Sequence, residues 1–228
     1  MIKNISNLGD AAVYCDFGSD VSETINTKVI NYFNHLSMLV KKNKINGINN
    51  ITPSYNKLII SFDLEKTNYL EIKKVVMNID IKEDAQNNNK KVKVPVCCEN
   101  EFGLDFKRLL DKTRLSKEEI LKFYLEKEYF CYMTGFIAGM PFLGDINKKI
   151  RCDRLETPRV KVPQGSVGIT EQFTNIYTFE SPGGWNIIGN TPLKIFDKLN
   201  LEEPALIKPG DKVSFYQISK KEYINWNE

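Results

Sequence analysis

The chain has 228 residues, 42% of them hydrophobic, which is enough for one large domain or two small ones with a real core. A formal net charge of only +3, spread evenly, favours neither nucleic acid nor an anionic membrane surface as a partner. No apolar run reaches the roughly 20 residues that cross a bilayer, so no membrane span is expected.

The first half of the chain alternates between strand and helix patterns. Strands are predicted over 11–17, 48–52 and 57–62, and helices over 25–40 and 67–79. Asp20 and Glu23 are expected to cap the first helix. In the second predicted helix, the residues expected to face the core are Leu70, Val75, Val76 and Ile79. The order β-α-β-β-α predicts a ferredoxin-like unit, with 92–96 as its last strand.

A polar segment of low complexity, 84–91, then predicts a domain boundary, which gives domains 1–88 and 89–228. Beyond it we expect helices over 105–112 and 116–127, the second opened by a capping box of Ser116 and Glu119. A buried strand over 129–134 follows, and 212–218 forms a strand near the end of the chain.

The stretch 157–192 is dense in turn residues, and it holds five of the 13 glycines and four of the nine prolines. Short β-type runs separate them, at 160–162, 166–169, 175–179 and 185–188. This pattern predicts a tightly turned all-β unit, a barrel or a sandwich. With the alternating first half, the fold class is α+β.

Ser181-Pro-Gly-Gly-Trp185 places an indole directly after two residues without side chains. Gly183 and Gly184 would let a ligand or a second backbone approach Trp185, although a tight turn with an aromatic core plug fits the same residues. Phe136, Met140 and Phe142 alternate with glycines and predict an apolar wall for a small planar ligand, or an ordinary buried loop.

The polar candidates lie on the same β-rich stretch. Arg159 is the best candidate for holding a carboxylate or phosphate, because its planar fork binds bidentately; the alternative is a surface ion pair. Thr174, Tyr177 and Ser181 would add hydroxyl groups to a polar wall.

Catalytic signatures are missing from the sequence. Five cysteines show no metal-binding spacing, and His35 is the only histidine, which excludes a histidine-based triad and a histidine-rich metal site. We therefore expect no metal and assign no catalytic residue. Free thiols and no recognisable secretory signal predict a reducing cytoplasm.

A series of short motifs, in order and spacing over more than a hundred residues, resembles one known family: the B subunit of 5-oxoprolinase, also called allophanate hydrolase subunit 1 or the KipI-type kinase inhibitor. The motifs are Val94-Pro-Val96, Glu101-Phe-Gly103, Gly135-Phe136, Pro158-Arg159, Val162-Pro163, Gly165-Ser-Val167, Ile176-Tyr177, Ser181–Trp185, Ile188-Gly189, Thr191-Pro192 and Lys208-Pro-Gly-Asp211. Gly9-Asp-Ala-Ala12 fits the family's N-terminal piece.

The resemblance implies a ferredoxin-like N-terminal domain and a cyclophilin-like β-barrel. It implies the A and C subunits of 5-oxoprolinase as partners in an ATP-dependent opening of 5-oxo-L-proline to L-glutamate, with ATP as co-substrate at a site shared with those partners. A chain of this kind is expected to be inactive alone. The other role known in the family, binding a sensor histidine kinase and inhibiting it, remains the alternative function.

Several positions depart from the pattern usual in the family. Ala138 and Thr178 stand where prolines are usual, Met140 and Phe173 where phenylalanine and glutamine are usual, and Asp145, Glu171 and Asn175 where glycines are usual; Tyr124 stands where histidine is frequent. We expect an altered ligand pocket. The residues assigned to ligand contact are Phe136, Arg159, Thr174, Tyr177, Ser181, Gly183, Gly184 and Trp185.

Overall fold

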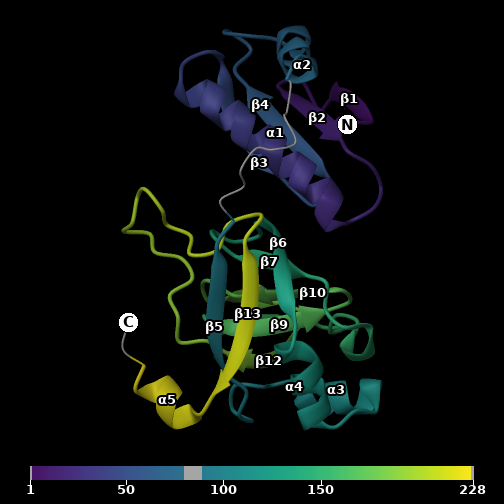
Figure 1. Ribbon diagram of the computed structural model, residues 1–228, viewed down its shortest axis with the longest axis vertical. Coiled ribbons are helices and arrows are strands. Elements are labelled where there is room, and N and C mark those ends of the chain that lie inside the picture. Colours follow the sequence, from purple (N-terminus) through teal and green to yellow (C-terminus); the bar gives the residue numbers. More distant parts are fainter. Residues whose placement is uncertain (1, 80–88, 227–228) are drawn as a thin grey trace. The chain divides into compact units, whose positions relative to one another are not determined.

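The computed structural model describes residues 2–79 and 89–226 (Figure 1). The chain forms two compact units, 1–88 and 89–228, and each has its own hydrophobic core. Most of the segment 84–91, interpreted above as a domain boundary, lies outside the described residues. No helix in the described part is long and apolar enough to cross a membrane.

The N-terminal unit is an antiparallel sheet with two helices, in the strand order β1-β2-β4-β3. Its elements are β1 (Asn4–Asn7), β2 (Ala12–Asp16), α1 (Glu23–Lys41), β3 (Ile48–Pro53), β4 (Lys57–Phe62) and α2 (Tyr69–Met77). Without β1 this is the predicted β-α-β-β-α order. The last strand, however, was assigned wrongly: β1 occupies that edge of the sheet and pairs with β2, while residues 92–96 belong to the barrel. The segment NISN has only one apolar residue, Ile5, so β1 showed no alternating pattern.

The helices of this unit differ in detail from the prediction. Ser22, and not Asp20, caps α1, because its hydroxyl accepts a hydrogen bond from Ile25 N at 3.3 Å. In α2 the buried residues are Ile72 and Val76, one turn apart, while the side chain of Leu70 is 72% exposed. An inward Leu70 was therefore wrong, whereas Val76 is buried and Val75 and Ile79 pack against the same core cluster.

The C-terminal unit is a closed barrel in the strand order β10-β7-β6-β13-β5-β12-β9. Its strands are β5 (Lys91–Cys97), β6 (Glu128–Thr134), β7 (Pro141–Gly144), β9 (Ser166–Thr170), β10 (Phe173–Ile176), β12 (Asn186–Asn190) and β13 (Lys212–Ile218). β5 and β13 run parallel along their whole length, and the other pairs are antiparallel. The α+β class and the barrel are confirmed.

Several short elements surround the barrel. They are α3 (Phe106–Thr113), α4 (Lys117–Leu125), the 3-10 turn η1 (Lys148–Ile150), β8 (Arg159–Val162), β11 (Ser181–Gly183) and α5 (Lys220–Ile224). The predicted capping box of Ser116 and Glu119 at the start of α4 is confirmed. β7 and β11 were not predicted, because both contain proline and glycine at positions that read as turns.

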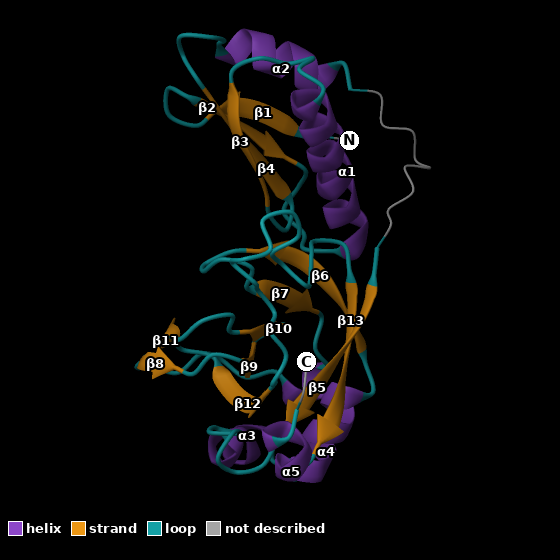
Figure 2. Ribbon diagram, turned by 90° about the vertical axis from the view of Figure 1, so that its left-hand side faces the viewer, coloured by secondary structure: helices purple, strands orange, loops and turns teal. Residues whose placement is uncertain are grey.

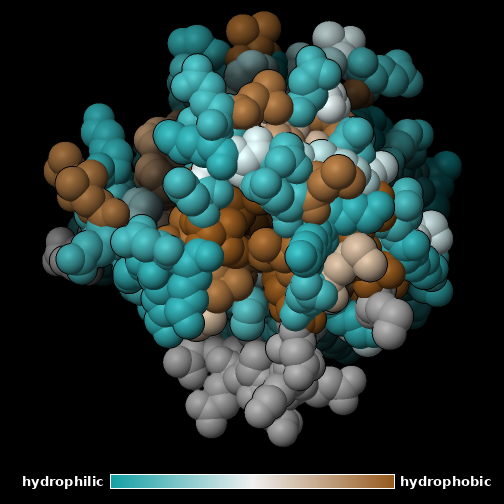
Figure 3. All heavy atoms as spheres, turned by 90° about the horizontal axis from the view of Figure 1, so that it is seen from above, coloured by the Kyte–Doolittle hydropathy of each residue, from teal (hydrophilic) through white to brown (hydrophobic). Residues whose placement is uncertain are grey.

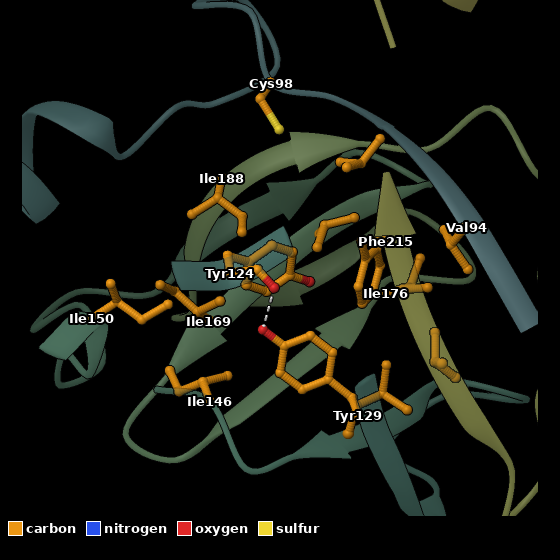
Figure 4. Packing of buried hydrophobic residues seen from close by; sticks show 14 of the residues in the cluster. Val94, Cys98, Tyr124, Tyr129, Ile146, Ile150, Ile169, Ile176, Ile188 and Phe215 are labelled. Atoms are coloured by element: carbon orange, nitrogen blue, oxygen red, sulfur yellow. Dashed lines mark hydrogen bonds between the residues drawn. The ribbon is translucent and has the colours of Figure 1, made fainter. Parts of the chain in front are cut away.

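Side chains fill the barrel interior. Tyr124, Tyr129 and Phe215 pack together there, with ring centroids 5.0–5.8 Å apart (Figure 4). Tyr129 Oη donates a hydrogen bond to the Tyr124 carbonyl at 2.7 Å. Aliphatic residues such as Ile169 and Ile176 close the remaining space (Figure 4). A barrel interior packed in this way is a core, so a ligand site must lie elsewhere.

Candidate functional site

The best-formed candidate site lies on the outside of the barrel wall, beneath a two-stranded ribbon of β8 and β11. Figure 2 shows this ribbon beside β9 and β10, and Val162 of β8 packs in one small cluster with Ile187 of β12. A pocket of about 280 Å³ opens here. It is lined by Phe136, Met140, Phe142, Arg154, Pro158, Tyr177, Pro182, Gly183, Gly184 and Trp185. Mostly apolar and aromatic walls with a few polar groups are typical of small-molecule sites.

A row of residues across four neighbouring strands lies beneath the pocket. Asn175 of β10 stands opposite Phe142 of β7 on one side and Gly168 of β9 on the other, and Gly168 stands opposite Ile187 of β12. Residues paired in this way point to the same face of a sheet. A Cβ atom on Gly168 would lie 2.8 Å from Asn175 Oδ1 and 3.0 Å from Trp185 Cβ. The glycine therefore leaves room for both side chains.

Trp185 lies over this row and is only 5% exposed. Its ring meets the Phe142 ring edge to face, with centroids 5.6 Å apart, and its Cβ lies above Gly168. Because Phe142 and Gly168 flank Asn175, the indole between them covers the Asn175 side chain. The Arg154 guanidinium contacts the same indole, 5.8 Å from its centroid.

Tyr177 contributes a buried hydroxyl group, and its side chain is 1% exposed. Burial raises the pKa of Tyr177, an effect that Asn175, the Trp185 backbone and the positive charges of Arg154 and Arg159 oppose. The phenol therefore stays protonated at neutral pH.

Five of the eight residues assigned to ligand contact line this pocket: Phe136, Tyr177, Gly183, Gly184 and Trp185. The space beside Gly183 is already taken, since a Cβ atom there would overlap the Tyr177 hydroxyl. Gly184 has only ordinary contacts, 3.5 Å or more from Pro158. The first glycine thus serves close packing inside the protein and not the approach of a ligand.

The other three assigned residues do not line the pocket. Arg159 Nη2 donates to the buried carboxylate of Asp105 at 2.6 Å, so the structure pairs it inside the molecule. Thr174 is fully buried on the core side of β10, and its hydroxyl donates to the Gly168 carbonyl at 3.0 Å. Because that uses its only proton, the Tyr124 hydroxyl donates to Thr174 at 2.9 Å. Ser181 Oγ is buried without a hydrogen-bond partner among the described residues.

Arg154 is the main lining residue that the sequence did not single out. It lies five positions before Arg159, and both precede the same β run. The sequence did show two arginines on either side of Pro158. It did not show which of the two would form an ion pair inside the protein.

Most positions that depart from the family pattern lie outside the pocket. Glu171 is in the turn between β9 and β10 at φ 45°, where glycine is the usual residue, and Phe173 packs edge to face on Tyr132. Thr178 Oγ1 donates to the Ala138 carbonyl at 2.7 Å, so two departures from proline contact each other. Among these positions, only Met140 lines the pocket. The departure from the family pattern that reaches the lining of this pocket is therefore Met140.

A second hollow lies on the N-terminal unit and measures about 490 Å³. Its hydrophobic lining comes from Ile2, Ile5, Tyr32, Val76, Met77 and Ile79. Figure 3 looks onto this unit and shows hydrophobic side chains gathered in the middle of an otherwise largely hydrophilic face. Within the described residues, no group of three or more histidine, cysteine, aspartate or glutamate side chains could hold a metal ion. The barrel pocket remains the candidate site.

Comparisons with known proteins match most of this chain to one family. Residues 3–207 match the family model described as carboxyltransferase domain, subdomain C and D. A Bacillus subtilis protein, named as the B subunit of 5-oxoprolinase, is 33% identical over 236 residues, which cover 98% of this chain and 96% of that protein. A protein of the same name from Haemophilus influenzae is 41% identical over 124 residues, covering 54% of this chain and 58% of that protein.

Two solved structures show the same architecture. The structure of TTHA0988 superimposes with a TM-score of 0.81 at 26% identity over 92% of this chain. This chain covers only 40% of TTHA0988. The conserved uncharacterized protein PH0987 from Pyrococcus horikoshii is 34% identical, with a TM-score of 0.57, over 96% of this chain and 100% of that one.

Proposed function

We propose a function on one premise: the chain belongs to the family of carboxyltransferase subdomains C and D and, within it, to the B subunits of 5-oxoprolinase. The chain acts as the B component of an ATP-dependent 5-oxoprolinase. The complex converts 5-oxo-L-proline, ATP and water to L-glutamate, ADP and phosphate. The observation that carries this proposal is the match to the Bacillus subtilis protein along nearly the full length of both chains.

The barrel pocket supports a ligand-binding role for this chain. At about 280 Å³ it lies at the lower end of the range for small-molecule sites, which suits a five-membered ring and is small for a nucleotide. Phe136, Tyr177 and Trp185 supply flat apolar walls for such a ring. We place the ATP site among the partner subunits or shared with them.

The chemistry requires partners. ATP phosphorylates the lactam oxygen and releases ADP, and water then attacks the activated carbon, so that the ring opens and phosphate leaves. No residue of this chain is assigned to either step. His35, the only histidine, lies on α1 of the other unit. We therefore expect the chain to be inactive alone and to work with the A and C subunits of 5-oxoprolinase.

A second candidate function, inhibition of a sensor histidine kinase, needs a surface that contacts another protein. The segment between β12 and β13 exposes Leu199 and Leu201 by 79% and 90%. Exposed leucines near one another suit contact with another protein. Such a surface suits contact with a kinase and contact with a partner subunit equally. We therefore keep the enzyme subunit as the first proposal.

The test is 5-oxoproline-dependent release of ADP by this chain mixed with its cognate A and C subunits, with each protein omitted in turn. We expect turnover only in the complete mixture. Full activity of the A and C subunits without this chain would overturn the proposal. The five cysteines are all buried free thiols, which supports a reducing compartment, and we propose the cytoplasm.

A further inference from the structure

Phe136 combines a strained backbone with an exposed side chain. It lies in the loop between β6 and β7 at φ 68°, in the left-handed region that bulky residues rarely adopt. Ile137 N donates to the Gly135 carbonyl at 2.9 Å, so Phe136 is the central residue of a γ-turn with positive φ, a rare and strained turn. Its side chain is nevertheless 68% exposed, and among the described residues it is the only phenylalanine in the group of exposed large hydrophobic side chains.

The loop around Phe136 is fixed by contacts to other segments. Thr178 Oγ1 donates to the Ala138 carbonyl at 2.7 Å. Gly139 packs so closely against Phe196 that a Cβ atom there would lie 2.2 Å from the Phe196 ring. Because these contacts hold the loop, the backbone cannot relax to relieve the turn. The protein therefore keeps a strained conformation that presents an apolar ring to solvent, and such outliers are concentrated at functional sites.

The surface beside the ring has the composition of a protein interface. Phe136 lines the mouth of the barrel pocket together with Pro158 and Pro182, and all three are exposed. Arg154 is the only charged residue of this lining; it is exposed, and in the described part of the chain no acidic side chain forms an ion pair with it. Aromatic residues and arginine are enriched in interfaces, whereas lysine, aspartate and glutamate are depleted.

A structural relative carries further protein next to this fold. This chain covers only 40% of TTHA0988, so the same architecture occurs there joined to a longer polypeptide. Protein of that kind is a suitable occupant for an apolar surface with a single positive charge. The charge adds a requirement: the occupant should place a carboxylate opposite Arg154.

We propose that Phe136 is a pre-positioned anchor for a partner protein: its ring enters an apolar socket of the partner, and a carboxylate at the edge of that socket pairs with Arg154. A ring on a fixed backbone loses little conformational freedom on binding, which favours association. The inference goes beyond the proposed function, which names the A and C subunits but no contact surface. It rests on the proposed function only in taking those two subunits as the partners.

The test measures the affinity of the full chain for the purified cognate A and C subunits, separately and together, by isothermal titration calorimetry. Phe136→Ala is expected to weaken the complex about 30-fold or more, as the loss of an interface hot spot does. Ile224→Ala is the matched control, because Ile224 on α5 is 66% exposed and equally apolar in character. It should change the affinity by less than about threefold.

Two further variants separate the anchor from a structural role. Phe136→Gly relieves the positive φ and removes a ring that is mostly exposed, so the unbound chain should melt at or above the wild-type temperature while binding as poorly as Phe136→Ala. Arg154→Gln should weaken the complex about tenfold at low salt and less at high salt, because salt screens a pair at the edge of an interface.

Several results would overturn the anchor. They are wild-type affinity of both Phe136 variants, an equal loss for Ile224→Ala, or a fall of more than about 5 °C in the melting temperature of Phe136→Gly, which would show a packing role. An unchanged complex with a raised KM for 5-oxoproline would assign the ring to a small ligand instead. Unchanged affinity of Arg154→Gln overturns the carboxylate of the partner.

The inference and the proposed function can fail separately. If the wild-type chain binds neither subunit while ADP release still depends on it, the anchor is wrong and the proposed function stands. If the A and C subunits turn over 5-oxoproline without this chain, the proposed function fails. In that case a complex that forms and is weakened by Phe136→Ala still supports the anchor, and the absence of any complex overturns it.

Discussion

The carboxylate of Asp105 connects three segments behind the pocket, and Asp105→Asn tests how much the site depends on it. Oδ1 accepts from Arg159 Nη2 at 2.6 Å, and Oδ2 accepts from Ile187 N at 2.6 Å. The Asp105 backbone N–H also donates to the Ile187 carbonyl at 3.0 Å. The start of α3 is thereby tied to β12 and to β8.

The expected loss follows from this geometry. An asparagine has one oxygen and one NH2 group, so whichever way it turns, one of the two donors faces another donor. A hydrogen bond to a charged group contributes about 1.5–3 kcal/mol, and the remaining bond loses its charge. Breaking a buried ion pair costs about 3–5 kcal/mol, but the Arg159 side chain is 27% exposed and water compensates part of that. We expect Asp105→Asn to lower the free energy of unfolding by about 3 kcal/mol.

Tryptophan fluorescence in urea measures this effect in the barrel unit alone, because both tryptophans, Trp185 and Trp226, lie within 89–228. With an m-value of about 2 kcal/mol/M, the midpoint should fall by about 1.5 M. Asp153→Asn is the matched control: its carboxylate is 65% exposed in a surface pair with Arg108, and its loss should cost less than about 1 kcal/mol. Equal midpoints for the two variants would refute the reasoning.

Three further outcomes are expected. Gly183→Ala places a methyl group against the Tyr177 hydroxyl and should lower the melting temperature, whereas Gly184→Ala, with ordinary contacts only, should not; equal effects in thermal melts would contradict this. Tyr124→Phe removes a buried hydrogen bond and should cost about 1 kcal/mol in urea unfolding, and a stabilised variant would be inconsistent with that bond. Burial raises the pKa of Cys98 from 9.0 to about 12, so the unfolded chain loses this proton first and stability falls as pH rises above about 9. The Cys98 contribution to that loss should be on the order of 1 kcal/mol at pH 10, and Cys98→Ala should show a correspondingly shallower decline between pH 8.5 and 10.

Local patterns predicted most of the elements because their causes are local. The capping box of Ser116 and Glu119 lies at the start of α4, where two side chains satisfy backbone N–H groups within one turn. The strand over 129–134 matches β6 within one residue. The strand β1, which completes the N-terminal sheet, could not be predicted. The segment NISN has no alternating pattern, and it becomes a strand through its pairing with β2.

Strand register decided which hydroxyl groups face the pocket. The predicted strand over 175–179 is β10 at Phe173–Ile176, and all but the first of its residues are buried. Alternation therefore gave no contrast between the two faces. Thr174 points to the core and hydrogen bonds with Tyr124, while Asn175 lies on the opposite face of the sheet, beside Phe142.

The amino-acid sequence was sufficient for the α+β class, the family, and the apolar and aromatic part of the site, because Phe136, Tyr177 and Trp185 lie in short motifs with local turn chemistry. The three-dimensional arrangement was needed to show which arginine is available to a ligand. Asp105 is 54 residues away from Arg159 in the sequence, yet its carboxylate neutralises that guanidinium at 2.6 Å and leaves Arg154 at the pocket. Charge pairing depends on distance in space, and no local pattern encodes it.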